Sequence, residues 1–145
     1  MASTASISEV GSRQSHSKAL HISLWVAQVL LAVLFGMAGT MKTTTPIAQL
    51  VAKMAWAGAV PEALVRFIGA SELAAALGII LPSATRIRPV LTPLAAGGLV
   101  LIMVLAAAFH ISRGEAQLVP VNLVLGALAA FVAWGRSKKA PISAR

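Results

Sequence analysis

Long runs of apolar residues alternate with short polar stretches along this chain and define its predicted elements. Four of the runs are long enough to cross a bilayer, whose hydrocarbon core needs about 20 mostly apolar residues per helix. They cover residues 22–41, 64–81, 90–111 and 118–134. Pro, Gly or charged residues bound each run, as expected at helix ends. The pattern therefore predicts an all-α integral membrane protein, a bundle of four transmembrane helices.

The segment between the first and second spans, residues 45–58, has a different pattern. Its apolar side chains recur at helical spacing, and one face carries Ile47, Leu50, Val51 and Met54. The segment is too short to span a bilayer. We interpret it as a short interfacial or partly re-entrant helix that rests its apolar face on the bundle or on lipid.

The polar ends of the chain flank a single predicted domain. Residues 1–21 are rich in Ser and have few large apolar side chains, which is typical of a disordered tail. A signal or transit peptide is the alternative, but the apolar run that follows exceeds the 7 to 15 residues of a secretory signal. Residues 22–136 form the predicted transmembrane domain, and residues 137–145 form a basic tail.

The charge pattern fits a membrane protein better than a nucleic-acid-binding protein. The net charge is +8, yet only 11% of residues are charged and 58% are hydrophobic. The basic residues lie between or outside the apolar runs, so we predict no nucleic-acid binding. Of the 12 Lys and Arg residues, most lie in the two tails and in the loop between the second and third spans. Because the more basic side faces the cytoplasm, both termini are predicted to be cytoplasmic, in a bacterial inner membrane.

Several kinds of chemistry find no support in the sequence. The chain has no cysteine, so any redox role relies on a partner or a bound cofactor. Its three histidines lack metal-ligand spacing, and we predict no metal site. Glycine-rich phosphate loops and nucleophile-elbow motifs are also missing. Whether the protein is an enzyme stays open. A quinone or lipid pocket is allowed, because it needs only apolar walls and a few polar groups.

Glu72 is the most informative polar residue, because it lies near the middle of the second span. A charge there costs about 2.5 to 3.5 kcal/mol, so the carboxyl group is expected to be paired or protonated and to face the bundle interior. Four further candidates fall in the outer half of the membrane, one on each span: Lys42, Arg66, His110 and Asn122. Their convergence predicts a polar cavity that opens outward, with Glu72 at its floor and the interfacial helix as a lid.

The spacing limits which of these residues can pair. Arg66 and Glu72 are separated by about 120° around their helix, so Lys42 or His110 is the better partner for the carboxylate. Each candidate also has a plainer explanation. Lys42 and Arg66 can extend to lipid headgroups, and His110 can be an interfacial residue or interact with the helix dipole. Asn122 can be a hydrogen-bonding contact between helices.

A set of short motifs resembles the DoxX and DoxX-like family of small four-helix membrane proteins, over about residues 22–136. The motifs are Gly39-Thr-Met-Lys42, Arg66-Phe-Ile-Gly69-Ala-Ser-Glu72, Leu81-Pro82, Thr92-Pro93-Leu94-Ala95-Ala96, Ala107-Ala-Phe-His110 and Arg113-Gly114-Glu115. Some members resemble the small membrane subunit of a thiosulfate:quinone oxidoreductase, and others are thought to anchor redox assemblies. The resemblance implies a subunit of a redox complex and carries over Lys42, Glu72 and His110 as candidate site residues.

Three functions stay open at this point. The first is a small subunit or anchor of a quinone-linked redox complex. The second is a non-catalytic scaffold that recruits partners through its basic tails and small-residue stripes. The third is a small proton-coupled transporter in which Glu72 titrates. Membrane lipids and redox proteins are the expected partners, and the small-residue stripes suit either a tight bundle or a homo-oligomer.

Overall fold

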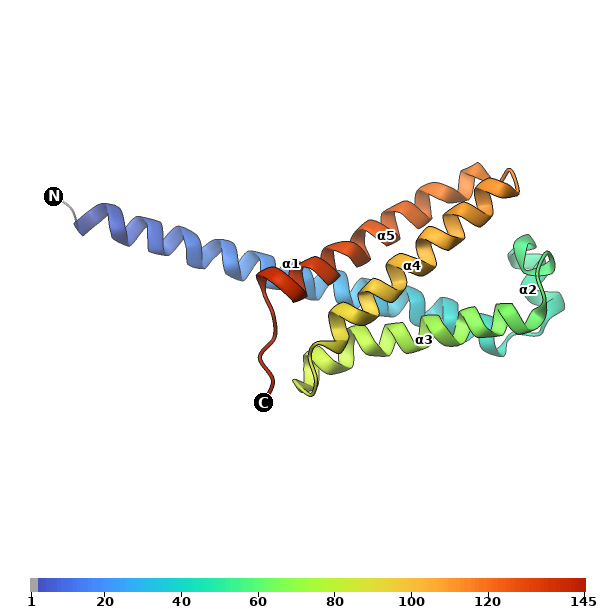
Figure 1. Ribbon diagram of the computed structural model, residues 1–145, viewed down its shortest axis with the longest axis horizontal. Helices are drawn as coiled ribbons and strands as arrows, with labels where there is room; N and C mark the ends of the chain where they lie inside the picture. Colours follow the sequence, from blue (N-terminus) through green and yellow to red (C-terminus); the bar gives the residue numbers. More distant parts are fainter. Residues whose placement is uncertain (1–2) are drawn as a thin grey trace.

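A computed structural model describes the chain from residue 3 to residue 145, with side chains described from residue 17 onward (Figure 1). The described part is helical and contains no strand. Its elements in chain order are α1 (Ser3–Thr44), α2 (Ile47–Lys53), the 3-10 helix η1 (Ala55–Gly58), α3 (Glu62–Thr85), α4 (Leu91–Ser112), the 3-10 helix η2 (Ala116–Leu118), α5 (Val119–Trp134) and the π-helix η3 (Gly135–Lys139).

Four segments of this structure are helical, long and apolar enough to cross a membrane. They are Ser17–Thr44, Glu62–Thr85, Leu91–Ser112 and Ala116–Lys139. Each matches one of the four predicted spans, and only the third begins a residue later than predicted, so the prediction of an all-α, four-span protein is confirmed. The predicted short helix between the first and second spans is α2, which is followed by η1.

The helices are arranged in two pairs (Figure 1). α1 packs along α3, α4 packs along α5, and contacts between α3 and α4 join the pairs. All four helices contribute to one buried core, which includes Leu31, Ile79, Leu99 and Val132. Toward the end of the bundle where α2 lies, the α4 and α5 pair diverges from α1 and α3.

Small residues bring α1 and α3 into unusually close contact. A Cβ atom on Gly39 would lie 2.7 Å from the carbonyl oxygen of Gly69, and one on Gly69 would lie 2.7 Å from Cβ of Lys42. Helices in lipid gain little from burying apolar side chains against each other, because lipid tails are equally apolar. Close backbone approach through glycine instead increases the packing contact between them. This approach also places the end of α1 directly against α3.

The N-terminal boundary differs from the sequence prediction. α1 already begins at Ser3, whereas the sequence predicts a disordered tail over residues 1–21. Residues 1 and 2, and the side chains up to residue 16, lie outside the described part of the structure. Residues 3–21 contain no proline. Extending an existing helix adds a hydrogen bond for each residue fixed, so the first span can continue backward through this segment.

Two further boundaries lie beyond their predicted positions. The second span is expected to end at Pro82, but α3 continues to Thr85 with the proline inside the helix. The nearby carbonyl of Ile79 accepts a 2.8 Å hydrogen bond from Gln28, in keeping with the way neighbouring helices stabilise backbone around a transmembrane proline. The fourth span continues through η3 to Lys139, so helix replaces the start of the predicted C-terminal tail.

Candidate functional site

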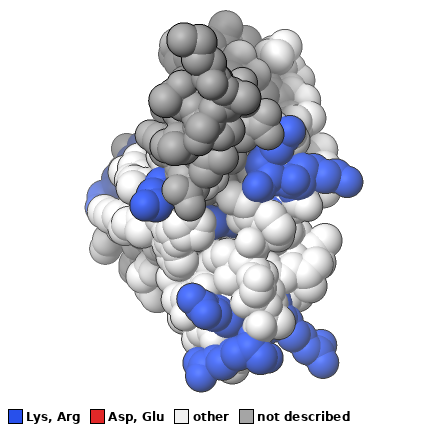
Figure 2. All heavy atoms as spheres, turned by 90° about the vertical axis from the view of Figure 1, so that its left-hand side faces the viewer, with Lys and Arg blue, Asp and Glu red and all other residues white. Residues whose placement is uncertain are grey.

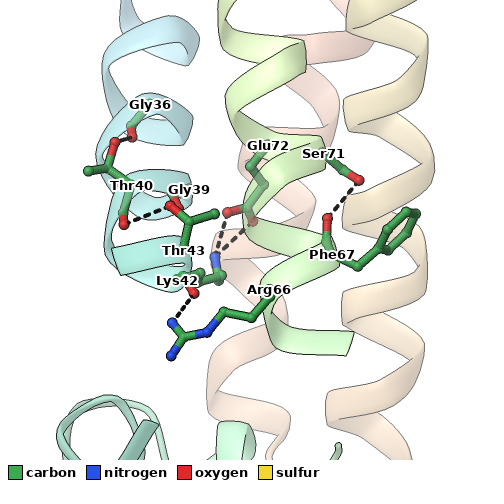
Figure 3. Close-up of polar contacts among 9 residues, drawn as sticks. All are labelled: Gly36, Gly39, Thr40, Lys42, Thr43, Arg66, Phe67, Ser71 and Glu72. Carbon is green, nitrogen blue, oxygen red and sulfur yellow. Dashed lines mark hydrogen bonds and ion pairs between the residues drawn. The ribbon is translucent and has the colours of Figure 1, made fainter. Parts of the chain in front are cut away.

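Lys42, near the end of α1, and Glu72, in α3, form a buried ion pair (Figure 3). Nζ of Lys42 donates hydrogen bonds to both carboxylate oxygens of Glu72, at 2.8 and 2.7 Å. The two side chains are 9% and 4% exposed. An unpaired charge at this depth would be strongly unfavourable, and charge-assisted hydrogen bonds offset part of that penalty. Of the two partners that the sequence offers for Glu72, the structure selects Lys42.

Arg66 does not join this pair. One of its terminal nitrogens donates to the carbonyl oxygens of Lys42 and Thr45, at 2.6 and 2.8 Å, and the other lies 2.8 Å from a carboxylate oxygen of Glu62. Figure 3 shows its side chain reaching toward the end of α1. The last carbonyl groups of a helix have no partner within the helix, so Arg66 stabilises the end of α1. Arg66 therefore supports the ion pair only indirectly, through its hydrogen bond to the backbone carbonyl of Lys42.

His110, near the end of α4, forms an ion-pair cluster with the turn that follows. Its Nδ1 lies 2.7 Å from one carboxylate oxygen of Glu115, and Nε of Arg113 lies 2.9 Å from the other oxygen. The hydrogen bond from His110, reinforced by Arg113, lowers the pKa of the Glu115 carboxyl group below its ordinary value. Gly114 makes the turn possible, because its φ of 72° is a conformation that favours glycine.

Asn122 lies one turn into α5 and carries a polar atom without a partner. Its side chain is buried, and its Nδ2 has no hydrogen-bond acceptor among the described residues. A buried amide donor left unpaired is unfavourable by about 1 to 3 kcal/mol. Such groups are rare in folded proteins, and a bound water or ligand is one way in which they are satisfied. The sequence identifies Asn122 as a candidate but does not show that its donor is unpaired.

These side chains border a cavity of about 500 Å³ between the two helix pairs. Its polar members are Lys42, Ser71, Glu72, His110 and Asn122. Its remaining walls are apolar and come from α1, α3, α4 and α5, and Trp56 and Val60 contribute from the segment after α2. Such an arrangement can hold a neutral, mostly apolar molecule that carries hydrogen-bond acceptors. Among the sequence-predicted candidates, Arg66 is not part of the lining.

Comparison with known proteins identifies the family. The chain matches the DoxX-like family over residues 26–132. It belongs to that family. Comparisons with curated proteins and with solved structures gave no match. The matched range includes all five candidate residues, and the family together with the four candidate spans identifies an integral membrane protein.

A second buried polar cluster of this DoxX-like protein links α1, α3 and α4 with η3, the continuation of α5, near the end that carries the termini. We call it the terminal cluster, and its members are Gln28, Ser83, Thr92 and Arg136. Nε of Arg136 donates to Oε1 of Gln28 at 2.6 Å, and Nε2 of Gln28 donates to Oγ of Ser83 at 3.1 Å. The hydroxyl groups of Ser83 and Thr92 lie 2.8 Å apart. The sequence signals only Gln28, as an isolated polar residue in an apolar span.

Proposed function

We propose that this DoxX-like protein is a small membrane subunit or anchor of a quinone-linked redox complex, and that its cavity holds the quinone ring. The observation that carries the proposal is an apolar cavity with an unpartnered amide donor, Nδ2 of Asn122, in its wall. Its volume of about 500 Å³ suits a small organic ligand, since ligand pockets range over about 300 to 1,000 Å³. Membrane quinones are apolar molecules with carbonyl acceptors, which such a donor can bind.

The charges of the cavity support a neutral ligand. Lys42 and Glu72 neutralise each other, so the cavity does not require an ion to balance it. The ammonium group has three donors, and both of its hydrogen bonds among the described residues go to Glu72. The remaining N–H of Lys42 and the free N–H of Asn122 would hold carbonyl oxygens of the ligand.

Reduction of a bound quinone takes up two electrons, supplied by a partner subunit, and two protons. This chain offers proton-carrying groups at two places on the cavity wall. Nζ of Lys42 shares its protons with the Glu72 carboxylate. His110 uses Nδ1 to contact Glu115, which leaves its Nε2 for the cavity, and the Glu115 side chain is 19% exposed. A proton can therefore pass from solvent through Glu115 and His110 to the cavity edge.

Orientation in the membrane follows from the same proposal. We place both termini in the cytoplasm of a bacterial cell and the cavity in the outer half of the membrane, because the end with the termini carries most of the Lys and Arg residues. The cysteine-free chain permits a direct test. Ser143→Cys and Gln117→Cys each introduce one thiol, at opposite ends of the bundle. A membrane-impermeant maleimide applied to intact cells is expected to label only Gln117→Cys, and labelling of Ser143→Cys alone would reverse the orientation.

Asn122→Leu, with Ser71→Ala as its matched control, tests the function. Both residues line the cavity, but the Ser71 hydroxyl is already bonded to the carbonyl of Phe67 at 2.8 Å. The complex would be purified in mild detergent through this chain, and quinone reduction measured with the partner's electron donor. We expect Asn122→Leu to raise the KM for quinone about five-fold, from the loss of one hydrogen bond, while Ser71→Ala leaves it unchanged.

The same experiment separates the proposal from a purely scaffolding role. A scaffold would support partner assembly with an unchanged KM in Asn122→Leu, and that result would remove the cavity from the reaction. A chain that purifies without any partner, from membranes whose quinone reduction does not depend on it, would contradict the subunit assignment itself.

A further inference from the structure

One end of the molecule is strongly basic. Figure 2 shows Lys and Arg side chains spread around this end, with no Asp or Glu among the side chains visible in that view. The described basic residues of this end are Lys18, Arg86, Arg88, Arg136, Lys138, Lys139 and Arg145. The described acidic side chains are Glu62, Glu72 and Glu115, and their ion pairs all involve residues elsewhere.

A hollow of about 540 Å³ lies within this basic end, between α1 and the chain from the end of η3 onward. Its lining includes Lys18 and His21 from α1, and Lys139, Ala140 and Pro141 from the C-terminal side. The hollow thus brings together two lysines that are far apart in the sequence. It lies where a transmembrane helix begins and another ends, the level at which lipid headgroups are found.

Arg136 lies behind the wall of this hollow and forms no ion pair with the acidic side chains that the structure describes. Its Nη1 donates to the carbonyl oxygen of Ala140 at 3.2 Å and lies 3.1 Å from Nδ1 of His21, and both of these residues line the hollow. Its Nε is bonded to Gln28, and its Nη2 is buried without a partner among the described residues. The whole residue is 3% exposed. Its guanidinium group also lies over the ring of Trp25, at 5.4 Å from the centroid. None of these described contacts supplies a negative charge, so a nearby anion would stabilise the buried guanidinium group further.

The local backbone holds the guanidinium group in this position. A Cβ atom on Gly135 would clash with Leu24, so glycine lets the end of α5 approach α1 closely enough for Arg136 to reach Gln28. The chain from Gly135 to Lys139 is a π-helix, a form that occurs frequently at functional sites. It turns Arg136 inward, and Lys139 of the same turn lines the hollow.

We propose that this hollow binds the phosphate group of an anionic membrane lipid, with Lys18 and Lys139 as its direct ligands and Arg136 as the positioning residue behind them. Arg136 holds the wall through Ala140 and His21, and the anion supplies the negative charge that the described residues lack. Basic pockets at the cytoplasmic ends of transmembrane helices suit such headgroups. A lipid is favoured over a free phosphate because the hollow lies at the end of the spans, where acyl chains can extend along the apolar helix surface.

A pair of double variants tests this site in the full-length protein. Lys18→Gln/Lys139→Gln removes the two lysines of the hollow. The control, Lys138→Gln/Arg88→Gln, removes two positive charges from the same end of the molecule, at residues that do not line the hollow. Each protein would be titrated in phosphatidylcholine nanodiscs containing increasing phosphatidylglycerol, and bound lipid counted by native mass spectrometry. Because Lys18 and Lys139 would contact the phosphate directly, we expect affinity to fall about thirty-fold in the first variant. The second variant loses only attraction at a distance, which salt screens, so its affinity is expected to fall less than about three-fold.

Equal losses in the two variants would overturn the proposal, because they would indicate a diffuse attraction rather than a site. A second arm titrates inorganic phosphate in place of the lipid. The proposal expects phosphatidylglycerol to bind at least about ten-fold more tightly, since acyl chains add apolar contact. Inorganic phosphate that competes at equal affinity would contradict a lipid site. Arg136→Lys adds a readout for the positioning role: it keeps the charge but loses the forked donors, and it is expected to weaken lipid binding without changing quinone reduction.

Discussion

The two buried polar clusters of this protein differ in how their charges are balanced. At the cavity, Lys42 and Glu72 form a complete ion pair, and an amide donor of Asn122 has no partner in the described part of the chain. In the terminal cluster, hydrogen bonds satisfy Gln28 fully, but the guanidinium charge of Arg136 has no acidic partner among the described residues. A balanced cluster with a spare donor suits a neutral ligand, whereas a cluster with an uncompensated positive charge suits an anion.

The comparison also separates binding from structural support. In the cavity, the polar groups face open space between helix pairs that diverge toward α2 (Figure 1). In the terminal cluster, Gln28, Ser83 and Thr92 bond to one another and to the carbonyl of Ile79, so they join the helices directly. Polar residues of this second kind contribute to stability even where they bind nothing.

The largest effect is expected from breaking the ion pair at the cavity. Glu72→Gln leaves the Lys42 ammonium group buried without its counter-charge, and we expect a loss of about 3 to 5 kcal/mol of unfolding free energy. Glu62→Gln is the matched control, because its pairing with Arg66 is partly exposed and contributes less than about 1 kcal/mol. Denaturation of both proteins in the same detergent measures the difference. Equal losses would show that the pair is not effectively buried.

Replacing the two polar residues by leucine sharpens the contrast between the clusters. Gln28→Leu removes an acceptor from Arg136 and a donor from Ile79, so we expect a loss of about 1 to 3 kcal/mol. Asn122→Leu removes a buried donor that has no partner among the described residues, so stability is expected not to fall and to rise by up to about 3 kcal/mol. The same denaturation assay measures both changes. A loss from Asn122→Leu would mean that its amide supports the fold.

The glycines that permit close helix contact give a smaller effect. Gly39→Ala places a Cβ against the backbone of Gly69, which cannot move aside locally, and we expect a net loss of about 1 to 2 kcal/mol. In contrast, the space around Gly97 is open, so Gly97→Ala should stabilise its helix by up to about 1 kcal/mol. Thermal unfolding of the two variants measures both signs. Stabilisation by Gly39→Ala would contradict the close contact of α1 with α3.

The smallest effect concerns the turn after α4. Because His110, with Arg113, lowers the pKa of Glu115, this pairing stabilises the turn above the ordinary carboxyl pKa of 4.5 and is lost as the pH falls through the lowered value. Carboxyl carbon NMR of labelled glutamate should give a midpoint for Glu115 below 4.5 in the wild type. The midpoint is expected to rise in His110→Gln. An unchanged midpoint in that variant would separate His110 from Glu115.

The fold could be predicted because each span can be recognised from its own stretch of sequence. Every apolar run is long enough to cross a bilayer without help from tertiary contacts, and the all-α, four-span prediction needed nothing more. Helix ends were less predictable. Pro82 lies inside α3 because the bundle stabilises the surrounding backbone, and such help depends on neighbours that the sequence does not place.

The candidate site was only partly accessible from sequence. The free-energy cost of a charge in the middle of a span singled out Glu72. Helix geometry excluded Arg66 as its partner and left Lys42 and His110, of which Lys42 is the one observed. The bond between Gln28 and Arg136 joins residues 108 positions apart and depends on how α5 ends against α1. Sequence periodicity carries no information on that crossing. The free donor of Asn122 likewise becomes visible only when all its neighbours are placed.

Fluorescence of Trp56 tests the central claim, that the cavity between the helix pairs binds a neutral carbonyl ligand. Trp56 lines the cavity, whereas Trp25 and Trp134 lie beside Arg136 and Lys139 at the basic end, so Trp25→Phe/Trp134→Phe leaves a single reporter. Titration with a short-chain quinone is expected to quench Trp56 to saturation, with an affinity that falls about five-fold when Asn122→Leu is added. Quenching that rises linearly without saturation, and equally in the two proteins, would contradict binding at this cavity.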